Sequence, residues 1–114
     1  MTKLRFGRDV QGLNAYAPDT SANKYNATLT NGAETHITVP SSNEVWIAAF
    51  AYQPGVTVWV DLTGATAAVP AGATLVSCTA ELNPGQRTVL AGSKISMITS
   101  NTTADVGVLL YASP

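Results

Sequence analysis

The sequence predicts an all-β fold: a single β-sandwich or jelly-roll-like domain of about eight short antiparallel strands. Segments rich in Val, Ile, Thr and aromatic residues recur about every ten residues, and their apolar side chains are spaced two apart. Gly or Pro interrupts the chain about every 8–12 residues, so no stretch supports a helix of normal length. A chain of 114 residues is long enough to bury the core of one such domain.

The chain divides into an N-terminal arm, residues 1–24, and a β-sandwich domain, residues 25–114. The arm contains Gly, Pro, Asp and Asn with little periodicity, which predicts an extended or irregular segment. Beyond the arm the predicted strands follow one another with short gaps. They are Tyr25–Thr30, Thr35–Val39, Glu44–Tyr52, Val56–Leu62, Thr74–Glu81, Arg87–Leu90, Lys94–Thr99 and Asp105–Ala112.

The gaps between these strands contain residues that favour tight turns. Asn31-Gly32 lies between the first two strands and is a pair favoured in type I′ turns, so these two strands are predicted to form a hairpin. Pro-Gly pairs at residues 54–55 and 84–85 predict tight turns of other types.

Charged residues are scarce in this chain. They make up 11% of it, against about 25% in an ordinary soluble domain. Thr, Ser, Asn and Ala must therefore cover the surface, which suits a protein that lies against another protein. The formal net charge of −1 gives no global signal for nucleic-acid or membrane binding. No signal peptide and no membrane span is visible, so we expect synthesis in the cytoplasm.

Half of the basic side chains lie within the first eight residues of the arm. Lys3, Arg5 and Arg8 account for three of the six Lys and Arg residues, and no acidic residue precedes Asp9. This cluster is either part of a solvated tail or a basic arm that reaches a partner.

Two predicted strands are apolar on both faces, whereas a strand of an isolated sandwich should have one polar face. In the strand that ends at Tyr52, one face holds Val45, Ile47, Ala49 and Ala51, and the other holds Trp46, Ala48, Phe50 and Tyr52. In the last strand, Val106, Val108 and Leu110 oppose Gly107, Leu109 and Tyr111. The strand Val56–Leu62 is more ordinary, with Val58 and Val60 predicted to face inward and Trp59 and Asp61 outward.

The second apolar face has two explanations. Either the arm folds back over it, or it packs against a neighbouring subunit. The second explanation predicts an oligomer interface of aromatic and Leu side chains, namely Trp46, Phe50, Tyr52, Trp59, Leu109 and Tyr111. If these aromatic side chains were exposed without a partner, they would favour aggregation. Trp46, Tyr52 and Trp59 would also suit a platform on which sugar rings stack.

The sequence lacks the patterns of ordinary enzyme sites. The single histidine, His36, has no signature partner, so we expect it to be a structural or surface residue. One His and one Cys cannot form a standard zinc site, and the dispersed carboxylates lack a calcium-loop spacing. Cys78, alone in an apolar run, is predicted to be a small buried residue. We therefore expect no enzymatic activity, no metal and no cofactor.

Three segments resemble small virion proteins of tailed bacteriophages: the run Val45–Val60, the segment Glu81–Arg87 and the closing Ala104–Ala112. The resemblance covers roughly residues 25–112 and lies in Ala- and Thr-rich strands, few charges and Pro-Gly turns. The closest type is the capsid decoration, or cement, protein. Such proteins are small β-rich domains, often trimeric, that bind the outside of the head.

The resemblance implies a structural virion protein that is made in the host cytoplasm, binds the major capsid protein and stabilises the shell. It implies a homo-oligomer, with a trimer favoured, and neither a nucleic-acid nor a membrane partner. Lys3, Arg5 and Arg8 would then pair with acidic capsid residues, and the second apolar face would form the seam between subunits. The alternatives are a tail or head-fibre component, and a carbohydrate-binding β-sandwich module for cell-surface attachment.

Overall fold

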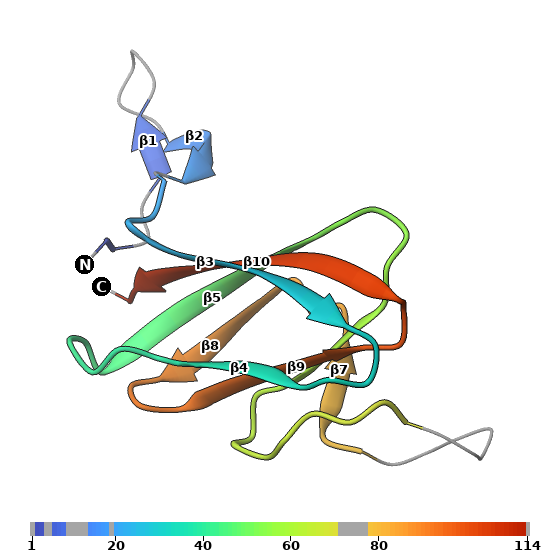
Figure 1. Ribbon diagram of the computed structural model, residues 1–114. Helices are drawn as coiled ribbons and strands as arrows, with labels where there is room; N and C mark the ends of the chain where they lie inside the picture. The colour runs from blue at the N-terminus through green and yellow to red at the C-terminus, as the bar shows by residue number, and fades with distance from the viewer. Residues whose placement is uncertain (1, 4–5, 9–13, 19, 71–77, 114) are drawn as a thin grey trace.

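The computed structural model describes residues 2–3, 6–8, 14–18, 20–70 and 78–113 of the protein. The described residues are all-β and contain no helix, and so none that could cross a membrane. Eight strands form two four-stranded antiparallel sheets that face each other, and two further strands pair outside them (Figure 1). The predicted β-sandwich is therefore confirmed.

The first sheet has the longest strand of the protein, β10, near its centre. Its strands, in spatial order, are β3 (Asn23–Thr30), β10 (Thr103–Ala112), β5 (Val45–Tyr52) and β8 (Gln86–Leu90). Each pair of neighbours is antiparallel. Both strands predicted to be apolar on two faces, β5 and β10, lie in this sheet side by side.

The second sheet packs against one face of the first. Its strands, in spatial order, are β4 (Thr35–Thr38), β9 (Lys94–Thr99), β6 (Val58–Asp61) and β7 (Ala80–Leu82). The predicted strand Thr74–Glu81 coincides with β7 only at its end, because residues 71–77 lie outside the described residues. The other seven predicted strands overlap β3–β6 and β8–β10.

The prediction of a hairpin at Asn31-Gly32 was wrong, because β3 and β4 belong to different sheets. A type I′ turn needs a positive φ at both central residues, and here only Gly32, at 71°, has one. The amide of Gly32 donates to the carbonyl of Thr99 in the second sheet, at 3.2 Å. The turn thus carries the chain from one layer to the other. In the described chain, every connection between β3 and β10 crosses between the sheets except the one from β6 to β7.

The Pro-Gly turn at residues 54–55 also joins the two layers. Gly55 has a φ of 80°, and the amide of Val56 donates to the carbonyl of Gln53 at 3.4 Å. These are the features of a type II turn, which requires a positive φ at its third position. The prediction of a tight turn here is confirmed.

The core lies between the two sheets, and Trp46 is its largest fully buried side chain. The inward side chains come from both layers and include Leu29, Ala48, Val58, Val60, Ile95, Met97, Val106, Val108 and Leu110. Within the described residues, every buried side-chain nitrogen or oxygen has a hydrogen-bond partner. The indole Nε1 of Trp46, for example, donates to the carbonyl of Asn43 at 3.0 Å.

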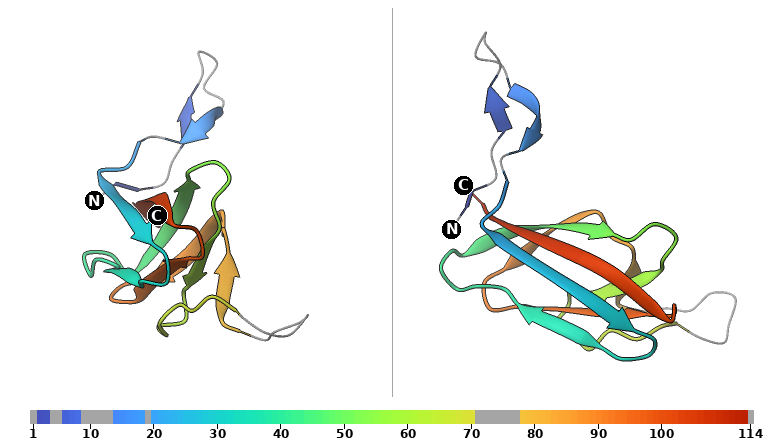
Figure 2. Two further views of the ribbon diagram at one scale, coloured as in Figure 1. Left: turned by 45° about the vertical axis from the view of Figure 1, so that its right-hand side comes forward. Right: turned by 45° about the horizontal axis from the view of Figure 1, so that its top comes forward.

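The remaining two strands form a hairpin at the N-terminus. β1 (Phe6–Arg8) pairs with β2 (Asn14–Pro18), where the sequence predicted an irregular arm. The hairpin projects from the end of the sandwich at which both chain termini lie, and it covers neither sheet face (Figures 1 and 2). The hairpin therefore does not fold back over the second apolar face, which was one of the two explanations for that face.

The base of the hairpin is fastened to the sandwich. Thr2 accepts a hydrogen bond from the amide of Ala112 on its carbonyl, at 2.6 Å, and one from the amide of Ala22 on its hydroxyl, at 2.8 Å. Lys3 forms a parallel bridge with Ala112, and the Ser21 hydroxyl donates to the carbonyl of Leu110. Both ends of the hairpin are thus anchored at the end of β10.

Candidate interaction surfaces

Part of the outer side of the first sheet is apolar. Side chains directly opposite each other on neighbouring strands share a face. Val45 lies opposite Leu90, and Ala49 lies opposite Leu109. Ile47 lies on the same side of β5, and none of these five side chains belongs to the core cluster. We call Val45, Ile47, Ala49, Leu90 and Leu109 the outer apolar face.

Exposure differs between side chains on this side of the sheet. Tyr111, opposite Ile47, is only 4% exposed, whereas Leu90 is 63% exposed. The remaining members of the outer apolar face are half-buried. An antiparallel sheet of an isolated sandwich normally shows polar side chains to solvent. The outer apolar face is thus the part of the first sheet that suits contact with another protein.

The six residues predicted to form an oligomer interface do not share one surface. Leu109 and Tyr111 lie on the outer side of the first sheet, and Trp59 lies on the outer side of the second. The other three, Trp46, Phe50 and Tyr52, lie on the inner side of the first sheet.

The prediction was wrong for Trp46, which is 0% exposed within a single chain. Phe50 and Tyr52 are partly buried against the core, with their rings stacked at 6.3 Å between centroids. Burial raises the pKa of Tyr52, whose hydroxyl donates to the carbonyl of Pro84. The sequence showed that β5 has two apolar faces, but alternation alone does not indicate which one turns inward. Val45 and Ile47, on the other face, were therefore missed.

The base of the arm lies next to the outer apolar face. Lys3 is exposed, and its Nζ donates to the carbonyl of Ser113 at 3.4 Å. Lys3 and Val45 line the same shallow hollow, together with Glu44. Arg8 lies in β1, and Arg5 lies outside the described residues.

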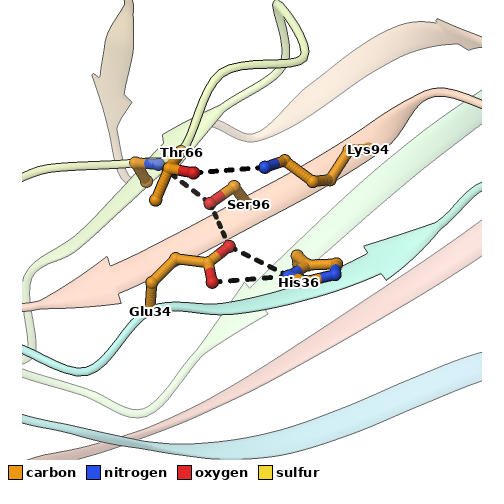
Figure 3. Close-up of polar contacts among 6 residues, drawn as sticks. Glu34, His36, Thr66, Lys94 and Ser96 are labelled. Carbon is orange, nitrogen blue, oxygen red and sulfur yellow. Dashed lines mark hydrogen bonds and ion pairs between the residues drawn. The ribbon is translucent and has the colours of Figure 1, made fainter.

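The outer side of the second sheet carries a polar cluster instead (Figure 3). The Ser96 hydroxyl donates to Oε1 of Glu34, and Nδ1 of His36 lies 3.1 Å from the same oxygen. The bond from Ser96 holds the pKa of the Glu34 carboxyl below its ordinary value, and His36 contributes in the same direction. The carboxylate thus lies between the hydroxyl and the imidazole. This order differs from a hydrolase triad, in which the imidazole lies between them.

This cluster fastens the segment that follows β6. The amide of Ala67 donates to the Ser96 hydroxyl at 2.8 Å, and Nζ of Lys94 donates to the Thr66 hydroxyl at 3.3 Å (Figure 3). Ala67 is only 3% exposed and Ser96 is 0% exposed. The segment of residues 62–70 therefore covers this part of the second sheet. His36 is a surface residue, as the sequence predicted.

Asp61 anchors the start of the same segment. It is 1% exposed, and its Oδ1 accepts hydrogen bonds from the amide and the hydroxyl of Thr63, at 2.8 and 2.6 Å. The Thr79 hydroxyl donates to Oδ2. Burial raises the pKa of Asp61, but the bonds from Thr63 and Thr79 outweigh burial and hold the pKa below its ordinary value.

Cys78 is exposed, so the prediction that it is buried was wrong. Of the described residues 78–82, Ala80–Leu82 form the strand β7, which lies at the edge of the second sheet. Among the described residues, no three His, Cys, Asp or Glu side chains are placed so as to hold a metal ion.

Comparison with known proteins identifies no relative. No protein-family model, no curated protein and no solved structure matches this chain. The features that bear on function are therefore the outer apolar face, the anchored hairpin and the polar cluster of the second sheet.

Proposed function

We propose that the protein is a non-enzymatic structural component of a tailed-bacteriophage virion, a capsid decoration protein that binds the outside of the head and stabilises the shell. The observation that carries the proposal is the outer apolar face of the first sheet, which lies beside an anchored, projecting arm. The sequence resembles small phage virion proteins in its Ala- and Thr-rich strands, few charges and Pro-Gly turns, and this resemblance is the reason for assigning the protein to a virion.

Burial of the outer apolar face favours a contact with a second copy of the chain. Each Å² of apolar surface removed from water contributes about 25 cal/mol. Ile47 and Leu109 carry no polar group that association would leave unsatisfied, so their burial has no desolvation penalty. We assign this face to the seam of a homo-oligomer, for which the resemblance favours a trimer.

The arm is assigned to the major capsid protein. A two-stranded hairpin is only marginally stable in water, so a partner surface would stabilise β1 and β2. Lys3, Arg5 and Arg8 give the arm a positive charge that suits acidic side chains on a shell. Many copies on one particle would add their weak contacts, which strengthens attachment.

The strand order supports a finer fold assignment as well. Two four-stranded sheets, with connections that cross between them at all but one step in the described chain, are typical of a jelly roll. Jelly rolls occur in many viral capsid proteins. This assignment is part of the proposal.

The test uses the phage genome that encodes the chain, with and without its gene. Heads that lack the protein should release DNA at a lower temperature, and purified protein added back should restore the wild-type value. Equal thermal survival of the two kinds of head would overturn the stabilising role. Location of the protein on the tail or on a head fibre would favour those alternatives.

A carbohydrate-binding module remains the second candidate because Trp59 is partly exposed. It lies opposite Leu82, which is 50% exposed, on the outer side of the second sheet. Trp46 and Tyr52 lie inside the sandwich, so this platform consists of one indole. Glycan-array binding that disappears in Trp59→Ala would support this candidate, and no binding to any glycan would end it.

A further inference from the structure

A hollow of about 510 Å³ lies over Gly107, on the outer side of the first sheet. Gly107 is in the middle of β10, where it pairs with Asn26 of β3 on one side and with Ala51 of β5 on the other. Thr28, Gln53 and Asp105 complete the polar part of the lining. The hollow is open to solvent, and its volume falls within the range of about 300–1,000 Å³ that is usual for small-molecule sites.

The backbone does not require glycine at this position. Gly107 lacks the positive φ found at other glycines of the chain, such as Gly32 and Gly55. Glycine in a strand interior weakens the strand, and it often marks a place where a ligand approaches closely. A Cβ atom at Gly107 would lie 3.0 Å from Oδ1 of Asn26. Because Gly107 has no side chain, the Asn26 carboxamide can lie close to the β10 backbone and the hollow stays open above it.

Two of the polar side chains around the hollow, Asp105 and Gln53, are held by hydrogen bonds. The Thr28 hydroxyl donates to Oδ1 of Asp105 at 2.7 Å. The backbone amide of Asp105 donates to Oε1 of Gln53 at 3.2 Å. Within the described part of the chain, Oδ2 of Asp105, Nε2 of Gln53 and the carboxamide of Asn26 make no hydrogen bond of their own. The hollow therefore offers a fixed carboxylate oxygen and two amide groups.

We infer that this hollow binds a neutral, hydroxyl-bearing sugar unit. A carboxylate oxygen accepts hydrogen bonds from sugar hydroxyls, and carboxamides both donate and accept them. An added peptide strand fits this place poorly, because β10 is already paired with β3 on one side and β5 on the other. Gly107 and Ala51 have no side chain beyond Cβ, which lets the face of a pyranose ring approach the sheet.

Binding by a single copy is expected to be weak, in the millimolar range. The side chains of Asn26, Gln53 and Asp105 are exposed, so water competes for each hydrogen bond. Many copies on one particle would raise the overall affinity for a glycan-coated surface. That gain depends on the proposed virion function, whereas the single-site affinity does not.

The test is a nuclear magnetic resonance titration of ¹⁵N-labelled protein with the methyl glycosides of glucose, galactose, mannose and N-acetylglucosamine. At least one glycoside should shift the amide signals of Asn26, Ala51 and Gly107. Asp105→Ala and Gly107→Ala should weaken that binding about tenfold or more, equivalent to about 1.4 kcal/mol. Thr103→Ala, on the same side of β10 but outside the hollow, should bind as the wild type does.

Three results would overturn the inference. They are no shift with any of the four glycosides, shifts that centre on Trp59 instead, and binding that Asp105→Ala leaves unchanged. Asp105→Ala keeps the test valid if Gly107→Ala fails to fold, since Asp105 is an exposed side chain. Attachment of Asp105→Ala to heads separates the two proposals, because loss of sugar binding with normal attachment leaves the decoration role standing.

Discussion

The two sheets of this sandwich differ in how their outer sides are covered. Part of the outer side of the second sheet is covered by the chain's own segment of residues 62–70, which is held by hydrogen bonds to Asp61 and Ser96. The first sheet instead presents the outer apolar face, on which Leu90 is 63% exposed. The hydrogen bonds of the second sheet select one particular segment of the same chain. The apolar side chains of the first sheet can pack against any apolar surface of complementary shape, including that of another protein.

Strand β5 allows the sharpest test of this difference, because neighbouring residues face opposite environments. Trp46→Ala should lower the free energy of unfolding by about 3–5 kcal/mol, since it empties a fully buried site in the core. Ile47→Ala should lower it by about 1 kcal/mol or less in the monomer, since Ile47 lies outside the core cluster. Urea unfolding of both variants measures the two values. Similar losses would mean that the two faces of β5 do not differ.

The stability of the second sheet and of the segment of residues 62–70 should depend on Asp61. Asp61→Ala should cost about 1–3 kcal/mol of stability, because the Thr63 and Thr79 hydroxyls lose their buried acceptor. Faster amide hydrogen exchange at Ala67 should accompany the loss. Asp105→Ala, which removes an exposed carboxylate from the other sheet, is the matched control and should have little effect.

The stability of the fold should fall in acid because of two carboxylates on the second sheet and its flanking segments. The folded-state pKa values of Glu34 and Asp61 are lowered, so both carboxylates stabilise the fold above their unfolded pKa values of about 4. This contribution is lost as the pH falls through the folded values. Thermal unfolding between about pH 5 and pH 3 should show a fall in stability that is shallower in Asp61→Asn. An equally steep fall in that variant would contradict the role assigned to Asp61.

The outer apolar face should govern assembly and have little effect on folding. Ile47→Asp should reduce the mass measured by light scattering to that of one chain, while the circular dichroism spectrum stays that of the wild type. Thr38→Asp adds the same charge to an exposed site on the second sheet and should leave the mass unchanged. A wild-type chain that is already monomeric at high concentration would rule out a seam between copies.

The sandwich should fold without the arm. A chain that lacks residues 2–12 loses the two hydrogen bonds that Thr2 accepts from the amides of Ala22 and Ala112, each worth about 1 kcal/mol, but no core side chain. Its sandwich should remain folded, and co-sedimentation with heads should be weakened. Normal attachment to heads would show that the arm is only a tail.

Much of the fold could be predicted from the sequence because it depends on local patterns. Alternation in the segment Val56–Leu62 placed Val58 and Val60 inward correctly, and breaker residues located most strand ends. The Asn31-Gly32 turn shows the limit. The same dipeptide serves a hairpin or a crossing between layers, and only the long-range partners of β3 and β4 decide between them.

The candidate surface was predicted in kind but not in detail. That β5 has two apolar faces was visible in the sequence, whereas the inward position of Trp46 depends on the space between the sheets. The exposed Leu90 lies on β8, which is distant in sequence from Val45 and becomes its neighbour only through pairing. The hollow over Gly107 likewise depends on three strands, so no local motif could reveal it.

Cryo-electron microscopy of the phage heads tests the central claim most directly. The account predicts density for this chain on the outside of the shell, with Ile47 and Leu109 buried against a sister copy and the hairpin β1–β2 in contact with the capsid. An outer apolar face open to solvent on every copy, or heads without this density, would contradict it.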